Sequence, residues 1–111
     1  MRVLLELGVD ANARTNDDTT MLHLAARSGD VKAIRVLLDL GADANARKND
    51  NTTPLHLAAQ YGNVGSTRVL LEHGANVGAE DSDGKTPFQL AQHREWQRDE
   101  TMQLLSERGG R

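Results

Sequence analysis

The sequence predicts an all-α repeat solenoid, in which helix–turn–helix units stack side by side and hairpin-like loops project from one edge. Two motifs that recur on the same period of 33 residues carry this prediction. The composition agrees with it, because hydrophobic residues make up 38% of the chain and aromatic residues only 3%. A core with few aromatic side chains suits thin layers of helices packed through leucine, valine, isoleucine and alanine.

Both motifs keep one period along the chain. The first starts at residues 20, 53 and 86, as Thr-Met-Leu-His-Leu-Ala-Ala, Thr-Pro-Leu-His-Leu-Ala-Ala and Thr-Pro-Phe-Gln-Leu-Ala. The second starts at residues 4, 37 and 70, as Leu-Leu-Glu-Leu-Gly, Leu-Leu-Asp-Leu-Gly and Leu-Leu-Glu-His-Gly. Two independent motifs on one period exclude a chance repeat. The 111 residues are therefore predicted to form a single repeat domain.

The first motif predicts a short helix, which the unit beginning at residue 53 illustrates. Thr53 supplies a side-chain oxygen for the helix N-cap, and Pro54 fits the first helical position, where its missing N–H costs nothing. Leu55, Ala58 and Ala59 fall on one face of this helix. The two alanines allow a second helix to approach closely.

The second motif predicts the partner helix of the same unit. Gly62 should turn the chain, and a helix from about residue 64 to 71 then points Leu70 and Leu71 inward. Gly74 should end it in a left-handed conformation that most side chains resist. The residues that follow are polar and rich in turn formers, so we expect an extended, hairpin-like loop.

The tips of these loops keep one backbone geometry with three different residues. Equivalent positions hold Asp18, Asn51 and Gly84. These residue types tolerate a positive φ better than others. We therefore expect a left-handed residue at each tip.

A helix–turn–helix with a projecting loop at this period resembles the ankyrin repeat over essentially the whole chain. The motif at 53–59 and the Gly-Ala-Asp-Ala-Asn-Ala motif at 41–46 carry the resemblance. Met21 replaces the usual proline, and Phe88 with Gln89 replaces Leu-His in the last unit. The resemblance divides the chain into a partial repeat at 1–13, complete repeats at 14–46 and 47–79, and a divergent C-terminal capping repeat at 80–111.

The two ends of the chain differ. The partial repeat lacks its first helix, which indicates a fragment of a longer array, with a naturally frayed end as the alternative. We expect a monomer, with end-to-end association possible through this uncapped N-terminal face. Residues 92–100 are mostly polar and predict a solvent-facing cap with Trp96 packed beneath it. Residues 109–111 are expected to form a mobile tail.

Composition excludes several classes of function. The net charge of −3 and the pI of about 5.7 argue against nucleic acid as a partner. The chain has no cysteine, which excludes disulfides and thiolate metal sites. No apolar run is long enough for a membrane span, and the start does not resemble a signal peptide. We therefore expect an intracellular protein, in the cytoplasm or the nucleus.

Two groups of residues raise the question of catalysis. The resemblance implies a structural role for His23 and His56, since this ankyrin histidine hydrogen-bonds around the helix start and the adjacent loop. Paired acids serve acid–base catalysis when a pocket encloses them. The acids here fall mostly on loops and solvent faces, at Asp17, Asp18, Asp39, Asp50, Glu80, Asp81 and Asp83. We expect no enzyme, no metal site and no cofactor.

Two asparagines suggest a modification. Asn12 and Asn45 each end a Leu-x₅-Asp-Ala-Asn pattern, which resembles the ankyrin asparagines that an intracellular asparaginyl hydroxylase accepts. The alternative, which we favour, is that each side chain hydrogen-bonds the loop backbone.

In ankyrin repeats, loop tips and the exposed side of the first helices usually hold the partner. Carried over by position, the resemblance implies three strips. The first is Arg14, Asn16, Asp17, Thr19, Arg27 and Ser28. The second is Arg47, Asn49, Asp50, Thr52, Gln60 and Tyr61. The third is Glu80, Ser82, Asp83, Lys85, His93 and Arg94.

The sequence thus predicts a non-catalytic protein–protein interaction module or scaffold. Tyr61 is the best single anchor, because tyrosine is enriched among residues that dominate binding energy. The alternative is a regulatory or targeting segment of a larger multidomain protein or effector whose activity lies outside this chain. Nucleic-acid recognition fits the acidic balance poorly. The irregular Met21 and Gly65 argue against a designed consensus array.

Overall fold

A computed structural model describes residues 11–92 and 98–110 of the chain. Its helices are α2 (Met21–Ser28), α3 (Val31–Asp39), α4 (Pro54–Gln60), α5 (Val64–Glu72), α6 (Pro87–Ala91) and α7 (Arg98–Glu107). Three expectations lie outside the described residues. They are the helix of the partial first repeat, the packing of Trp96, and the placement of His93 and Arg94.

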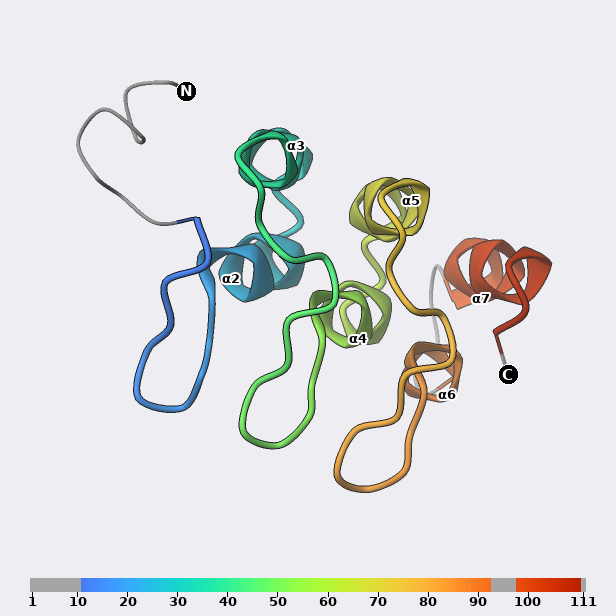
Figure 1. Cartoon of the computed structure of the whole chain (residues 1–111). Helices are drawn as coiled ribbons and strands as arrows, with labels where there is room; N and C mark the ends of the chain where they lie inside the picture. Colours follow the sequence, from blue (N-terminus) through green and yellow to red (C-terminus); the bar gives the residue numbers. More distant parts are fainter. Residues whose placement is uncertain (1–10, 93–97, 111) are drawn as a thin grey trace.

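The helices form two parallel layers (Figure 1). The first helix of each unit lies in one layer, where α2 contacts α4 and α4 contacts α6. The second helices form the other layer, where α3 contacts α5 and α5 contacts α7. The starts of the first helices, Met21, Pro54 and Pro87, are 33 residues apart. The all-α solenoid with projecting loops is therefore confirmed.

The first helices begin where the sequence predicts, and for the predicted reason. The side chains of Thr20, Thr53 and Thr86 each accept a hydrogen bond from the amide three residues on, at 3.3 Å. The side chain at that third position in turn accepts from the threonine amide, which completes a capping box. Gln89 fills this role in α6 as the histidines do in α2 and α4.

The second helices end on left-handed glycines. Gly41 and Gly74 have φ values of 94° and 87°, as predicted for Gly74. The amide after each glycine returns to a carbonyl of the last helical turn, which satisfies a group that would otherwise lack a partner.

The expectation of a mobile C-terminal tail is wrong for Gly109 and Gly110. Gly109 has a φ of 90°, and the Gly110 amide donates to the Leu105 carbonyl at 2.8 Å. Gly110 is buried, and a Cβ there would lie 3.1 Å from Val77. These two residues repeat the glycine ending of α3 and α5, so they close α7.

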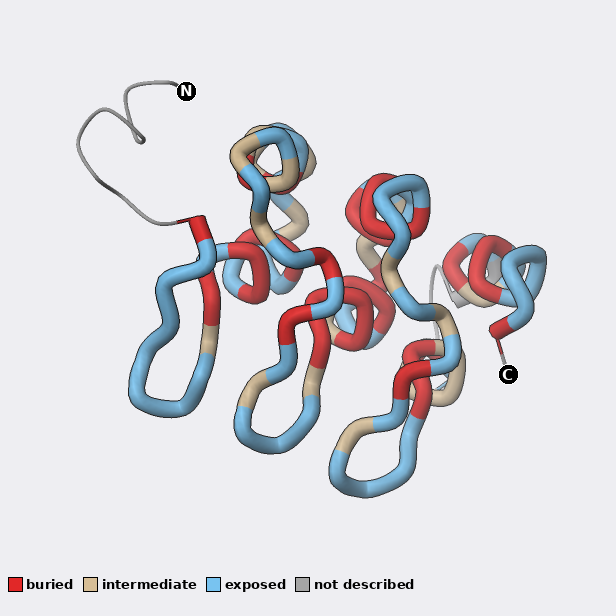
Figure 2. The backbone as a smooth tube through the Cα atoms, viewed as in Figure 1, coloured by how far each residue is buried: buried red, intermediate tan, exposed pale blue. Residues whose placement is uncertain are grey.

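The core is a continuous aliphatic cluster between the two layers. Leu22, Ile34, Leu55, Leu70 and Leu105 are fully buried, and alanines fill the narrow space between helices. Figure 2 shows buried positions on the facing sides of the helices and exposed positions along the loops. As the composition predicts, aliphatic packing forms this core.

The projecting loops are narrow hairpins. In each loop, one backbone hydrogen bond crosses the stem, as from the Thr15 amide to the Thr19 carbonyl at 2.9 Å, and a second closes the tip, as from the Asp18 amide to the Thr15 carbonyl at 2.9 Å. The tips have the predicted positive φ, which is 65° at Asp18 and Asn51 and 76° at Gly84.

Hydrogen bonds between loops join the hairpins into one continuous edge. The Asn49 amide donates to the Asp17 carbonyl at 3.1 Å, and the Ser82 amide donates to the Asp50 carbonyl at 2.9 Å. These bonds repeat from one unit to the next, so each loop is held in a fixed position relative to its neighbour. This edge forms one wall of the candidate site.

Candidate functional site

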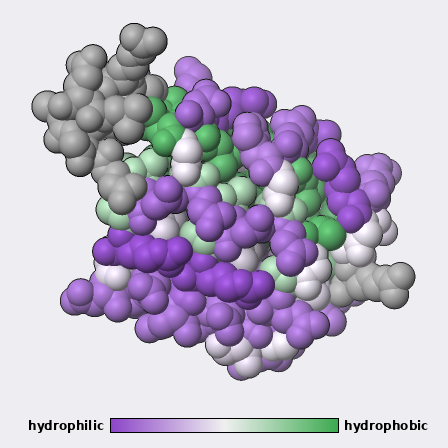
Figure 3. Space-filling model, viewed as in Figure 1, coloured by the Kyte–Doolittle hydropathy of each residue, from purple (hydrophilic) through white to green (hydrophobic). Residues whose placement is uncertain are grey.

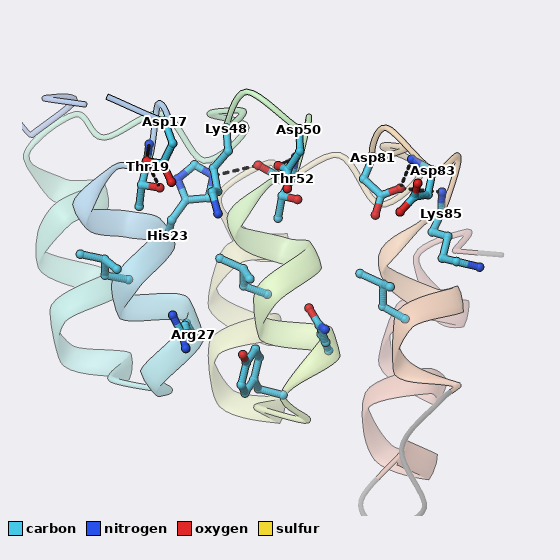
Figure 4. A pocket seen from close by; sticks show the side chains of 15 residues that line it. Asp17, Thr19, His23, Arg27, Lys48, Asp50, Thr52, Asp81, Asp83 and Lys85 are labelled. Atoms are coloured by element: carbon cyan, nitrogen blue, oxygen red, sulfur yellow. Dashed lines mark hydrogen bonds between the residues drawn. The ribbon is translucent and has the colours of Figure 1, made fainter. Parts of the chain in front are cut away.

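A groove of about 640 Å³ runs between the loop edge and the first-helix layer. Figure 4 shows its residues coming from three successive loops and three successive helices. Hydrophilic residues dominate the loop edge in the space-filling view, whereas hydrophobic residues gather toward the second helices (Figure 3). The groove itself combines a floor of leucines from the first helices with a wall of charged loop residues.

The floor has one leucine from each first helix. Leu24, Leu57 and Leu90 line the groove at equivalent positions, each directly after the residue that completes the capping box. Leu24 is 54% exposed, and the other two are half-buried. The sequence prediction of the site missed these leucines, although their 33-residue spacing was visible.

The far side of the groove holds a cation over an aromatic ring. The Arg27 guanidinium lies 5.7 Å from the centroid of the Tyr61 ring. Tyr61 is 40% exposed. This contact restrains the ring, and its exposed part remains accessible to a partner.

The wall carries carboxylates that their own loops hold in place. Oδ1 of Asp17 accepts hydrogen bonds from the hydroxyl of Thr15 and from the amide and hydroxyl of Thr19, the last two at 3.3 and 2.8 Å. The Thr15 and Thr19 hydroxyls lower the pKa of Asp17 to about 2. This carboxylate is therefore fully ionised at neutral pH.

The next two loops use related arrangements. Burial alone would raise the pKa of Asp50, but hydrogen bonds from Thr52 outweigh it and lower the pKa. In the last loop, Oδ1 of Asp81 accepts from the amides of Asp83 and Lys85, both at 2.9 Å. Asp81, which was predicted only as a surface acid, and Lys48, which was not among the predicted contact residues, both line the groove.

The two histidines are structural, as the resemblance implies. Nδ1 of His23 accepts from the Thr20 amide at 3.1 Å, so its proton lies on Nε2, which donates to the Thr52 carbonyl at 2.9 Å. His56 repeats this geometry toward Lys85. Burial lowers the pKa of both rings, which stay neutral at pH 7.

The structure brings half of the predicted contact residues together. Those that line the groove are Asp17, Thr19, Arg27, Asp50, Thr52, Gln60, Tyr61, Asp83 and Lys85. Those that lie elsewhere are Arg14, Asn16, Ser28, Arg47, Asn49, Glu80 and Ser82. His93 and Arg94 lie outside the described residues.

Physical reasons explain several of the residues outside the groove. Nη1 of Arg14 donates to the Arg47 carbonyl at 2.8 Å, and Nη1 of Arg47 donates to the Glu80 carbonyl at 3.1 Å. Both arginines therefore brace neighbouring loops. The Ser28 hydroxyl turns back onto its own helix and donates to the Ala25 carbonyl at 3.2 Å.

Asn12 and Asn45 also link consecutive units. The Asn12 side chain donates to the Gly41 carbonyl at 3.0 Å and accepts from the Asp43 amide at 2.7 Å. Asn45 makes the same pair of bonds to Gly74, at 3.1 Å, and to Asn76, at 2.6 Å. The favoured hydrogen bonding to the loop backbone is present, and hydroxylation of either residue stays a prediction.

Within the described residues, no group of three or more histidine, aspartate or glutamate side chains is arranged to hold a metal ion. No described helix combines the length and the apolar character that crossing a membrane requires.

Comparison with known families agrees with this architecture. A family model described as "Ankyrin repeats (3 copies)" matches residues 41–111, and one described as "Ankyrin repeats (many copies)" matches residues 4–58. No curated protein matches the chain. The chain belongs to the ankyrin repeat family, whose members are generally protein–protein interaction modules.

Proposed function

We propose that the chain binds a partner protein in the groove between its loops and first helices, without catalysing a reaction. One observation carries the proposal. Three large hydrophobic side chains are exposed in the described residues, and two of them, Leu24 and Tyr61, line this groove. Exposed apolar surface beside a polar rim is typical of an interaction site.

The rigidity of the wall supports this proposal. Backbone bonds and the arginine braces fix the loops relative to one another before any partner arrives. A site held in its binding geometry loses little conformational entropy on association, which favours affinity.

The state of the carboxylates supports binding rather than acid–base catalysis. A general acid near neutral pH needs a raised pKa. Hydrogen bonds lower the pKa of both Asp17 and Asp50. These groups are therefore suited to charge pairing.

Quantitative affinity capture from cell extract tests the proposal. The groove variant carries Arg27→Ala with Tyr61→Ala, and the control carries Arg35→Ala with Arg68→Ala, two exposed arginines of the second helices. We expect the wild type and the control to recover the same proteins and the groove variant to lose them. Equal recovery by all three would reject the groove as the binding site.

A further inference from the structure

We propose that the groove binds an extended peptide segment in which basic side chains accompany aliphatic ones. This inference rests on the proposed function and names the chemistry of the partner. The occupant would place lysine or arginine against the loop wall and leucine-like side chains on the floor.

The charge of the wall carries the first step. It presents four carboxylates, from Asp17, Asp50, Asp81 and Asp83, against two lysines, Lys48 and Lys85, which leaves a net charge of −2. No ion pair joins these groups within the described residues. The wall therefore attracts a cationic partner, and the net charge of −3 on the whole chain acts in the same direction.

The second step is that the acids are fixed while the lysines keep flexible stems. The hydrogen bonds within the loops end on Oδ1 of Asp17 and of Asp81. Within the described residues, Oδ2 of each remains available for a charge-assisted hydrogen bond from an ammonium or guanidinium group. A lysine that bound an acidic partner would first have to lose its rotamer freedom.

The third step concerns the positive side of the groove. Arg27 already lies over the Tyr61 ring, at the edge opposite the carboxylates (Figure 4). An acidic peptide would have to cross the negative wall or displace this contact. A basic and aliphatic peptide fits without either change.

The apolar floor supplies the affinity, because exposed charge pairs contribute only about 0–1 kcal/mol each. Leu24, Leu57 and Leu90 come from three successive first helices, and the carboxylates come from three successive loops. Both rows therefore follow the stacking direction. An extended chain, whose side chains alternate between two sides, can contact both rows at once.

Fluorescence anisotropy with three synthetic peptides of equal length tests the inference on the full chain. One alternates lysine with leucine, the second replaces lysine with glutamate, and the third replaces leucine with serine. We expect the lysine–leucine peptide to bind at least about tenfold more tightly than either other peptide, and to weaken as salt rises.

Matched variants locate the binding. Asp17→Asn with Asp50→Asn keeps the side-chain acceptors but removes the charges, and we expect it to weaken the lysine–leucine peptide about threefold to tenfold. Asp39→Asn, on an exposed position of α3, should change nothing. Leu24→Ala should also weaken binding, whereas Met21→Ala, exposed on the same helix outside the groove, should not.

The outcomes separate this inference from the proposed function. Tighter binding of the glutamate–leucine peptide, still dependent on Leu24, would overturn the basic partner and keep the groove. Absence of binding by all three peptides would also overturn the basic partner, while the affinity capture decides the groove independently. Binding of the lysine–leucine peptide that is unchanged by Asp17→Asn with Asp50→Asn and by Leu24→Ala would overturn this inference, because the peptide would then bind outside the groove, and the affinity capture would still decide the proposed function.

Discussion

The two helix layers differ in how strictly the repeat is kept. In the first layer, α2 and α4 share the capping threonine, the histidine, the groove leucine and both alanines. In the second layer, Ile34 of α3 corresponds to Thr67 of α5, and both are fully buried. The first layer must meet the neighbouring loop through specific hydrogen bonds, whereas the second layer must mainly fill space.

The inter-unit bonds show why this difference arises. Each histidine donates to a carbonyl of the next loop, and each bracing arginine reaches the loop after its own. Within the described residues, no side-chain hydrogen bond of this kind joins α3 to α5, which contact each other through packing. Equivalent positions of successive units therefore keep the same residue most strictly where a side chain must hydrogen-bond to the next unit.

The largest expected effect comes from the shared core of the first layer. We expect Leu55→Ala to lower the free energy of unfolding by about 3 kcal/mol, because Leu55 is fully buried between units. Urea denaturation followed by circular dichroism measures this. The control is Leu24→Ala, which removes an equal side chain from an exposed groove position and should cost less than about 1 kcal/mol. Equal losses would contradict the assignment of Leu24 to the groove floor.

The next effect concerns the histidines of the first layer. We expect His56→Gln to cost about 1 kcal/mol at pH 7.5, because glutamine keeps the capping box, as Gln89 does in α6, but loses the ring's bond to the Lys85 carbonyl. Urea midpoints measure this loss. A variant as stable as wild type would show that the link between units contributes nothing.

The same rings should make stability depend on pH. Burial lowers the pKa of His23 and His56, so below about pH 6.5 the unfolded chain binds protons that the folded chain rejects. Stability should therefore be complete above pH 6.5 and fall as the solution becomes more acidic. The double variant His23→Gln with His56→Gln should lose this dependence between pH 7.5 and 5.5. Asp17, whose pKa is about 2, contributes only below about pH 4.

One substitution in the second layer should make the protein more stable. Ser66 is buried, and its hydroxyl has no hydrogen-bond partner. We expect Ser66→Ala to raise the free energy of unfolding by about 1 kcal/mol, because it removes an unsatisfied polar group. Thr67→Val is the matched control, since the Thr67 hydroxyl donates to the Asn63 carbonyl at 2.9 Å and its loss should not stabilise. Thermal unfolding compares the two.

Sequence patterns predicted the fold almost completely and the site only in part. Local chemistry fixes the capping threonines, the left-handed tips and Gly74, and the structure confirms all of them. Repeat boundaries at residues 13, 46 and 79 stay a prediction.

The misses concern geometry between units. From the sequence alone, Arg14 cannot be distinguished from an arginine that binds a partner. In the structure, the next loop lies close enough for the Arg14 side chain to donate a hydrogen bond to its backbone. Helical periodicity separates Leu22, which is buried, from Leu24, which is exposed, but it does not show that the projecting loops turn the exposed row of leucines into the floor of a groove. Gly109 and Gly110 suggested a free tail, because the closing turn of α7 depends on where that helix ends.

The smallest effect compares local stability within the second layer. Gly65 lies inside α5, where glycine costs about 1 kcal/mol relative to alanine, and the N-cap Asn63 makes no capping bond to the helix. Its side chain donates instead to the Ala26 carbonyl of the previous unit at 3.0 Å. In α3, by contrast, Asp30 caps the helix by accepting from the Ala33 amide at 3.1 Å.

We therefore expect amides of α5 to exchange hydrogen about fivefold faster than those of α3, by hydrogen–deuterium exchange resolved by NMR. Asn63→Asp is the sharper probe, because aspartate favours the N-cap but cannot donate to the Ala26 carbonyl. If the cap limits α5, this variant should slow its exchange. If the hydrogen bond from Asn63 to Ala26 matters more, exchange in α5 should become faster. Asn63 would then link neighbouring units from the turn between helices, as the histidines do from the first layer. Equal protection of α3 and α5 in the wild type would refute the difference between them.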